Sequence, residues 1–330
     1  MIKKLLLIFL LTYPQFSHSS VEVDFNIWLK KFKITAHEEG ISEETINNSL
    51  KNAKYLEQVI KYDRYQPEFF EDTKTYIKKR ATRSRMLKAK ALLIKNKKLF
   101  DEVEKKFKVE KELLLALWGI ETNFGKHVGK MDIISSLATL SFDKRRSKFF
   151  SKELIVLLKL IDQKMIDIDT LYGSWAGAIG NFQFMPSAIK NYAIDYDKNN
   201  KIELKESLQD AVASAANYLN KIGWKYQSSC FYKVELTKPI SKKYINTSAK
   251  KIKNYRTIKL WKKKGIVDIE QISDKNKAAL VIPDLAVPEG NENSPAFLVF
   301  ENYEKILKWN RSLRFGVTVC ILANMIKNEI

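Results

Sequence analysis

Histidine and cysteine, the side chains on which most metal centres and many nucleophilic enzymes depend, are nearly absent from this chain. Its 330 residues include three histidines and two cysteines. One of the histidines, His18, lies in a segment that we expect to be removed. This scarcity excludes a histidine-rich zinc site and argues against Ser-His or Cys-His catalysis. Carboxylates are therefore the leading candidates for proton transfer.

The two cysteines, Cys230 and Cys320, lie far apart in the sequence and lack metal-ligand spacing. An oxidising compartment would permit a disulfide between them. A buried free cysteine behaves as a small hydrophobic side chain and is an equal alternative. The sequence leaves both possibilities open.

Acidic residues are in the minority. The chain has 58 lysines and arginines against 38 acids, a formal net charge of +20. Such a charge favours an anionic partner, and nucleic acid, anionic lipid and anionic wall polymers all qualify. Much of the lysine is spread along helical segments such as Lys88 to Lys98, where a solvated face is the simpler interpretation. Composition alone does not choose the partner.

Hydrophobic runs long enough to span a membrane are also missing. The N-terminus carries Lys3 and Lys4, an apolar run from Leu5 to Tyr13, and then Ser17-His18-Ser19, with small residues where a signal peptidase reads. The run is short for a membrane span, and no cysteine follows it to accept a lipid. We expect a signal peptide at residues 1–19 and a soluble periplasmic protein after cleavage. An uncleaved anchor is the alternative.

Hydrophobic residues make up 45% of the chain, which is enough for a packed core. Periodicity predicts a mainly α protein with a small β-containing insertion. The expected helical segments are 25–37, 42–50, 68–98, 113–125, 133–142, 149–161, 208–221, 303–308 and 315–326. The expected strands are 231–236, 278–282 and 296–300. No internal repeat of fixed period is found.

The segment from Leu113 to Gly125 is an apolar helix that carries an acid near its end. Leu113, Leu117 and Glu121 recur at intervals of four, so the carboxylate shares the face that should pack inward. Burial raises the pKa of a carboxyl group towards the value that a general acid needs near neutral pH. A helix-terminal glutamate that turns out to solvent is the plainer alternative.

Two further segments have the composition of a ligand groove. Arg145 and Arg146 adjoin a helix start, where the helix dipole does not favour cations, so they are candidates to hold an anionic or hydroxyl-rich ligand. The stretch 172–187 is rich in glycine and aromatic residues and includes Gln183, a mixture that suits a sugar groove. Surface charge and a tight helix crossing are the respective alternatives.

Residues 195–206 follow the calcium-loop template. Asp195, Asp197 and Asn199 supply oxygen side chains at its first, third and fifth positions, and Glu206 stands at the twelfth. Asn200 replaces the usual glycine at the sharp turn, which weakens the match. An Asx-turn connector is the alternative.

Taken together, these segments resemble the lytic murein transglycosylase B family over nearly the whole mature chain. The matching stretches are Arg64-Tyr65-Gln66-Pro67-Glu68-Phe69, Ala116 to Gly125, Phe142-Asp143-Lys144-Arg145-Arg146, Gly173 to Ser187, and Asn310 with Ser312. Their common order makes a chance match improbable.

The resemblance implies a lysozyme-like helical core with a helical N-terminal region and a small β subdomain. The corresponding divisions are 20–110 for the N-terminal region, 111–225 for the catalytic core with its calcium-type loop, 226–300 for the β subdomain and 301–330 for a C-terminal helical part of the core. It also implies an enzyme that acts on peptidoglycan glycan strands, with no nucleic-acid partner. We expect a monomer without a stable membrane span.

The resemblance further assigns roles to single residues. Glu121 takes the place of the family's single catalytic acid/base, and no cofactor is required for catalysis. Residues expected to line the glycan groove are Arg145, Arg146, Ser174, Gln183 and Asn310. Ligands implied for a structural Ca²⁺ are Asp195, Asp197, Asn199, the Lys201 carbonyl and Asp210.

The chain departs from the family pattern at Asn199 and Asn200 in the loop, at Trp309, where a tyrosine is frequent, and at Phe315, where a groove tyrosine can stand. These departures concern metal affinity and subsite detail rather than reaction class. The alternatives to a transglycosylase are a muramidase that hydrolyses the same bond and a non-catalytic peptidoglycan-binding protein.

Overall fold

The computed structural model describes residues 18–66, 70–286 and 294–329. The expected signal peptide therefore lies outside the described residues, except for its last two positions, which begin the first helix. Among the described residues, no helix combines the length and apolar content that crossing a bilayer requires.

Helices dominate the first two thirds of the chain. They are α1 (His18–Glu38), α2 (Glu43–Leu50), α3 (Glu57–Arg64), α5 (Thr73–Arg80), α6 (Arg83–Lys95), α7 (Lys97–Phe107), α8 (Lys111–Thr122), α9 (Ile133–Phe142), α10 (Ser147–Asp162), α11 (Pro186–Tyr192) and α12 (Leu208–Lys221). A small antiparallel pair, β1 (Met131–Asp132) and β2 (Tyr172–Gly173), and a short 3₁₀ turn η1 (Ile168–Thr170) lie among them.

The segment 68–98, expected to be one basic helical stretch, is divided in the structure. α5 ends at Arg80, and the side chain of Thr82 accepts a hydrogen bond from the backbone N–H of Arg85 and starts α6. A capping threonine satisfies an N–H group that the helix itself cannot pair. The prediction of a continuous helix was therefore wrong at this point.

The larger sheet occupies the region that was expected to contain strands. Its elements are β3 (Phe231–Leu236), η2 (Lys242–Tyr244), β4 (Ile245–Asn246), β5 (Arg256–Thr257), α13 (Ile258–Lys263), β6 (Ile266–Val267), β7 (Lys277–Val281), η3 (Pro283–Ala286) and β8 (Ala296–Val299). The order is β4-β7-β8-β3-β6, with β5 also paired to β7. Only the β4–β7 pairing is parallel, and β8 lies antiparallel to both β7 and β3.

The two faces of this sheet bury different layers, because successive side chains of a strand point to opposite sides. One face joins the main core through Phe231, Ala279, Val281, Phe297 and Val299. The other face is covered by the segment around α13, through Val234, Ala278, Leu280, Ala296 and Leu298 packed with Ile258 and Trp261. The region thus has an inner side towards the helices and an outer layer.

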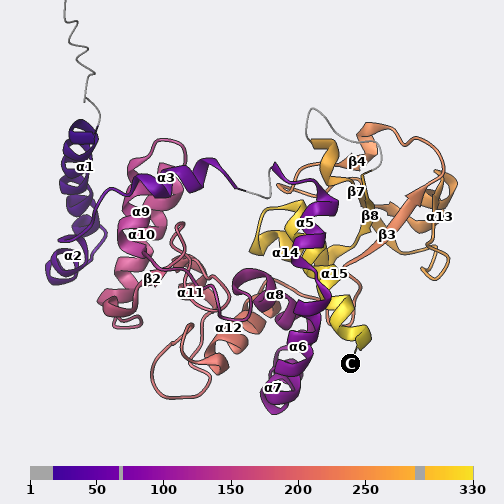
Figure 1. Cartoon of the computed structure of the whole chain (residues 1–330), viewed down its shortest axis with the longest axis horizontal. Coiled ribbons are helices and arrows are strands. Elements are labelled where there is room, and N and C mark those ends of the chain that lie inside the picture. The colour runs from indigo at the N-terminus through magenta and orange to yellow at the C-terminus, as the bar shows by residue number, and fades with distance from the viewer. Residues whose placement is uncertain (1–17, 67–69, 287–293, 330) are drawn as a thin grey trace, which may run out of the picture.

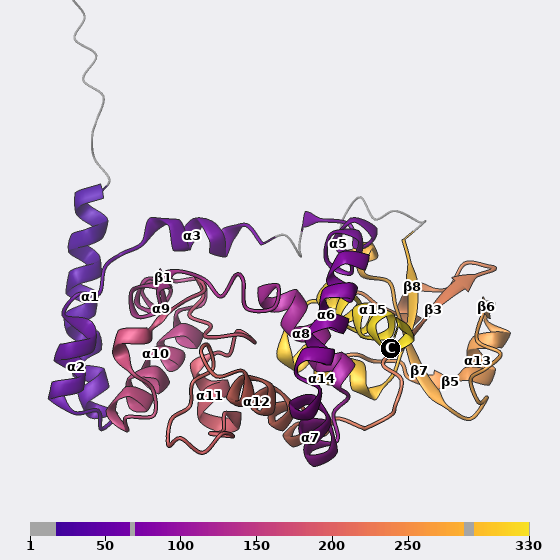
Figure 2. The ribbon, with the colours of Figure 1, turned by 60° about the horizontal axis from the view of Figure 1, so that its bottom comes forward.

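Two C-terminal helices, α14 (Glu301–Trp309) and α15 (Leu313–Glu329), complete the core. α15 packs against α5, α6, α8 and α14, so helices from both ends of the sequence meet at the centre. Figures 1 and 2 show α1 and α2 at one end of the molecule and the sheet with α13 at the other. The mainly α fold class with small sheets is confirmed.

Two links fasten the sheet region to the helices. Cys230 and Cys320 form a disulfide between the start of β3 and α15, which decides the alternative that the sequence left open. The carboxylate of Asp284, in η3, accepts hydrogen bonds from the backbone N–H of Thr73 (3.0 Å) and from the guanidinium of Arg314 (2.9 Å). The side chains of Thr73, Asp284 and Arg314 are all buried, so this second link anchors the sheet region within the core.

Candidate active site

Glu121 lies one residue before the end of α8. Leu113 and Leu117 on the same face are buried, and Glu121 itself is half-buried. The chain then turns sharply through Asn123, at φ +52°, and Phe124, at φ +60°. Asparagine tolerates the left-handed region and serves as a helix stop. The helix expected over 113–125 therefore ends at Thr122, and the carboxylate is only partly withdrawn from solvent.

A buried amide fixes this helix end. Asn181 accepts a hydrogen bond from Trp118 Nε1 at 2.9 Å, and its backbone carbonyl accepts one from the Thr122 hydroxyl at 2.8 Å. Its side-chain amide also donates to the carbonyls of Leu204 and Lys205. Because every partner is fixed by backbone or core packing, the last turn of α8 is held in place by residues far along the chain.

The carboxylate of Glu121 meets an aromatic wall. Trp309 Nε1, at the end of α14, donates to Glu121 Oε1 at 3.0 Å. The indole of Trp309 stacks on Tyr218, with ring centres 4.9 Å apart, and meets Phe184 edge-on at 5.4 Å. This wall fixes the direction in which the carboxylate points. Burial, with a smaller contribution from Tyr192, raises the pKa of Tyr218 to about 12, so its hydroxyl stays protonated.

A groove of about 630 Å³ runs along this wall. Three of the expected groove residues, Arg146, Gln183 and Asn310, line it together with Trp309 and Trp175. Its volume lies within the range typical of ligand sites. The amides of Gln183 and Asn310 and the aromatic rings among the lining residues suit a sugar ring, which presents hydroxyls at its edge and C–H groups on its faces.

Gln183 and Ser174 are held by backbone groups. The side-chain N–H of Gln183 donates to the carbonyls of Gly180 (2.9 Å) and Val128 (3.2 Å). The hydroxyl of Ser174 accepts from the backbone N–H of Ala178 at 2.9 Å. Ser174 is absent from the residues that line the groove. Its observed contact shapes the loop that carries Trp175.

Arg145 and Arg146 enclose a carboxylate that the sequence analysis had overlooked. Arg145 Nε donates to Asp63 Oδ2 at 2.7 Å, Arg146 donates to Asp63 Oδ1, and Arg64 donates to Asp63 Oδ2 at 2.7 Å. Asp63 is 2% exposed. Burial alone would raise the pKa of Asp63, but the hydrogen bonds and charges of Arg145 and Arg146 outweigh it and hold the pKa below its ordinary value.

The arginines therefore have an internal partner, and only Arg146 of the two expected ones lines the groove. Val59 and Asp63 stand four residues apart on α3 and are both buried, the spacing that singled out Glu121 on its own helix. The sequence did not predict α3, so this signal did not identify Asp63.

A second carboxylate that was not predicted from the sequence, Glu153, stabilises a helix beside the groove. Glu153 of α10 is 4% exposed and accepts hydrogen bonds from the backbone N–H (2.8 Å) and the hydroxyl (2.7 Å) of Ser187. Ser187 lies in the first turn of α11. A carboxylate at a helix N-terminus satisfies N–H groups that the helix leaves unpaired. Glu153 therefore fixes the helix that follows the Gln183 loop.

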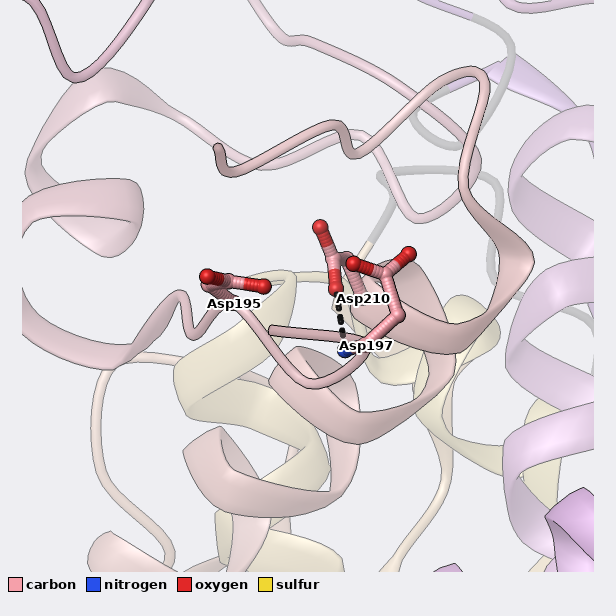
Figure 3. Close-up of side chains that lie close together, drawn as sticks. All are labelled: Asp195, Asp197 and Asp210. Carbon is pink, nitrogen blue, oxygen red and sulfur yellow. Dashed lines mark hydrogen bonds between the residues drawn. The ribbon is translucent and has the colours of Figure 1, made fainter. Parts of the chain in front are cut away.

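The calcium-type loop brings three carboxylates together. Oxygen atoms of Asp195, Asp197 and Asp210 lie within 4.8 Å of one another, and Figure 3 shows the three side chains gathered between the loop and α12. An all-oxygen donor set is the kind that Ca²⁺ prefers. The fully buried Asp210 also accepts the backbone N–H of Tyr196 at 2.7 Å, which ties the loop to α12.

Among the described residues, Glu206, at the twelfth position of the template, does not belong to this carboxylate cluster, whereas Asp210, a ligand that the resemblance implies, belongs to it. Asn199 is engaged within the loop, since its Oδ1 accepts the N–H of Lys201 at 2.8 Å and its Nδ2 donates to Glu203. The Lys201 carbonyl remains a predicted ligand.

The family described as "transglycosylase SLT domain" matches residues 24–324 of the chain. A membrane-bound lytic murein transglycosylase B from Escherichia coli (strain K12) is 42% identical over 117 residues, which are 35% of this chain and 32% of that protein. The chain thus aligns with about a third of the length of this relative.

Solved structures resemble the whole fold. Crystal structures of SltB3 from Pseudomonas aeruginosa, in complex with NAG-NAM-pentapeptide and with NAG-anhNAM-pentapeptide, superpose with a TM-score of 0.80 at 29% identity, covering 92% of this chain and 79% of that one. The Escherichia coli lytic transglycosylase Slt35, in complex with calcium, gives a TM-score of 0.76 at 24% identity, covering 93% and 94%. The second likeness shows the fold alone.

Proposed function

The chain belongs to the transglycosylase SLT-domain family, and we propose that it is a peptidoglycan lytic transglycosylase with Glu121 as its single acid/base. It would cleave the β-1,4 bond between N-acetylmuramic acid and N-acetylglucosamine and leave a 1,6-anhydro-N-acetylmuramic acid end. The relatives that carry this activity in their names, and the SltB3 complexes with peptidoglycan fragments, support the substrate class.

The main support for the proposal is the position of the Glu121 side chain. It is a half-buried carboxylate that accepts a hydrogen bond from Trp309, and Trp309 lines the groove. A general acid must stand within reach of the bond it protonates and be partly shielded from water. The partial burial of Glu121 and its hydrogen bond to Trp309, which lines the groove, support this role, although Glu121 itself is not among the lining residues.

In the proposed reaction, protonated Glu121 donates its proton to the glycosidic oxygen, and the bond from that oxygen to C1 of N-acetylmuramic acid breaks. The N-acetyl group of the substrate assists at C1, so no second protein carboxylate is needed. The ionised Glu121 then takes the proton of the C6 hydroxyl, whose oxygen bonds to C1 and closes the anhydro ring. Glu121 ends protonated, and no water is consumed.

We assign different tasks to the five predicted groove residues. Arg146, Gln183 and Asn310 line the groove and would contact the glycan. Arg145 would act through Asp63, by holding the arginine cluster in place, and Ser174 through the loop that presents Trp175. The alternative that all five contact substrate directly is less well supported by these contacts.

We further infer a structural calcium site. Asp195, Asp197 and Asp210 would bind the ion, with Asn199 and the Lys201 carbonyl completing its oxygen ligands. The ion would supply positive charge that offsets the repulsion among the three carboxylates. Asp210 connects this loop to α12, whose Tyr218 belongs to the groove wall, so the ion would stabilise the wall without taking part in the reaction.

The N-terminal sequence supports export to a periplasmic space, where peptidoglycan is found, and a soluble mature protein. Sequencing the N-terminus of the protein purified from its host tests cleavage near Ser19. A chain that keeps residues 1–19 and pellets with membranes would refute soluble export.

Product analysis tests the activity itself. Purified peptidoglycan digested with the protein should release muropeptides that end in 1,6-anhydro-N-acetylmuramic acid, lighter by one water than hydrolytic products. Mass spectrometry separates the two. Products with free reducing ends would identify a muramidase, and binding without release would identify a non-catalytic wall protein.

A further inference from the structure

One stretch of the sheet region is strongly and uniformly basic. Between Lys238 and Lys264 there are eleven lysines and arginines and no aspartate or glutamate. Acids elsewhere in the chain are numerous enough to interrupt such a run, since they total 38 in 330 residues. Ten of the eleven cations are lysines, and Arg256 is the exception.

Much of this stretch belongs to the outer layer of the sheet region. Ile258 and Trp261 of α13 are buried against the outer face of the sheet, and Tyr244 packs on the same cluster. The inner face adjoins the helical core that contains the groove. Both views of the ribbon place α13 at the end of the molecule opposite to α1. The exposed side of this layer therefore faces away from the groove.

Several of these lysines converge. Lys264 Nζ lies 4.1 Å from the centre of the Tyr244 ring, and Lys243 Nζ lies 5.3 Å from the same ring. The Lys238 stem lies against Gly265, where an added Cβ would come within 2.7 Å of its Cγ. We define the outer basic surface as Lys238, Lys242, Lys243, Lys259, Lys263 and Lys264, all exposed except the half-exposed Lys264.

This arrangement costs folding stability. Lys259 and Lys263 stand one helical turn apart on α13, and like charges at that spacing repel. Among the described residues, Lys262, the neighbour of this surface, pairs with Asp274, whereas the six lysines of the outer basic surface have no ion pair with an acid. Folding alone gives no reason to collect them, so the surface has the character of a site for an external anion.

We propose that the outer basic surface docks the protein onto a bilayer that contains anionic lipids. Lysine carries a compact, hydrated charge that suits the diffuse negative charge of a bilayer surface. Arginine, in contrast, is the residue that most often forms bidentate hydrogen bonds to phosphates and to base edges. Base-stacking surfaces are also lacking, because Trp261 is fully buried and Tyr244 is half-buried beneath two lysines. Docking is independent of the groove and would leave the groove turned away from the bilayer.

The test measures co-sedimentation of the full-length protein with vesicles of phosphatidylcholine mixed with phosphatidylglycerol, and with pure phosphatidylcholine. Each lysine near an anionic surface strengthens partitioning about fivefold. The triple variant Lys238→Gln, Lys243→Gln, Lys264→Gln should therefore bind anionic vesicles on the order of a hundredfold more weakly. Raising the ionic strength should weaken wild-type binding.

A matched control removes three exposed lysines elsewhere, Lys30→Gln, Lys95→Gln and Lys105→Gln, with the same change in net charge. It should bind nearly as well as wild type, and both triple variants should cleave a soluble glycan at the wild-type rate. The N-terminal segment, which carries Lys3 and Lys4, is the same in both triple variants, so the difference between these two variants reports on the outer basic surface.

Equal binding by the two triple variants, or equal binding of wild type to the two vesicle types, would overturn the proposal. The proposal would also be overturned if duplex DNA competed with anionic vesicles for the protein and bound it more tightly. Loss of cleavage with intact vesicle binding would bear on the groove alone, so a failure of the proposed activity is distinguishable from a failure of docking.

Discussion

The hydrogen bond from Trp309 shapes the chemical environment of Glu121. The indole N–H of Trp309 reaches Oε1 from a residue 188 positions later in the chain. This contact fixes one carboxylate oxygen, and the aromatic rings behind it limit the access of water. The proposed acid/base residue is therefore positioned by the α14 end as much as by its own helix.

Replacing Glu121 with glutamine should preserve the fold and abolish nearly all cleavage, because the amide can still accept from Trp309 but cannot exchange a proton. General acid–base assistance is worth about 10²–10⁴-fold, and one residue is assigned both halves here. We expect a loss at the upper end of that range, measured as turnover on purified peptidoglycan. Glu112→Gln, on the same helix, is the matched control and should cleave normally. A Glu121→Gln variant as active as wild type would remove the site assignment.

The Asp63 cluster predicts a dependence of stability on pH. Because the folded pKa of Asp63 is lowered, its contribution is fully present above the unfolded value of about 3.9 and is lost as pH falls through the folded value. Asp63→Asn should cost about 2–4 kcal/mol at neutral pH, since three arginines then face a neutral amide.

Chemical unfolding at a series of pH values measures this effect. The gap between wild type and Asp63→Asn should stay constant above about pH 5 and narrow below it. Asp101→Asn removes a more exposed carboxylate that also pairs with lysines and should cost about 1 kcal/mol or less. A constant gap down to strongly acidic pH would contradict the assignment of a lowered pKa.

Short-range sequence signals were sufficient for most of the regular elements. The strand 231–236 was predicted with the bounds that the structure gives. α3, α11 and α13 were missed because helices of six to eight residues offer too few repeats for a periodic pattern. The break between α5 and α6 was also missed, because it depends on a single capping residue, Thr82.

The site was only partly predictable for a different reason. Periodicity on α8 singled out Glu121 because the relevant neighbours lie within two turns. Trp309, Asp63 and Glu153 act on residues 34 to 188 positions away, and no local pattern reports such pairings. Arg145 was predicted to line the groove, but it is absent from the lining residues and its observed partner is Asp63.

The loop before α12 predicts a response to calcium. At about a hundredfold excess over the dissociation constant, calcium should stabilise the fold by roughly 2.7 kcal/mol. Thermal melts with calcium and with a chelator should differ accordingly, and Asp197→Asn should reduce the difference. Magnesium is the control ion, because it demands a tighter octahedral shell. Identical melts with calcium and with chelator would show that the loop is only a connector.

At the scale of the whole molecule, the Cys230–Cys320 disulfide ties the sheet region to the C-terminal helix α15. Closing a loop of this size restricts the unfolded chain, and native disulfides typically contribute about 2–4 kcal/mol. The double variant Cys230→Ser, Cys320→Ser should lose that amount in chemical unfolding. Reductant should destabilise wild type and leave the double variant unchanged. Equal unfolding midpoints for the two proteins under oxidising conditions would contradict this expectation.

The position of α15 has a consequence for the timing of synthesis. α8 finds its main partner in a helix that begins roughly 190 residues later, a delay of roughly 10–40 s at ordinary ribosomal speed. During that interval α8 can pack against α6 and α7, but the face that α15 covers in the folded protein stays exposed. The nascent chain therefore carries an exposed apolar face, and a slowly translated or stalled chain should be more prone to aggregation until α15 has been made.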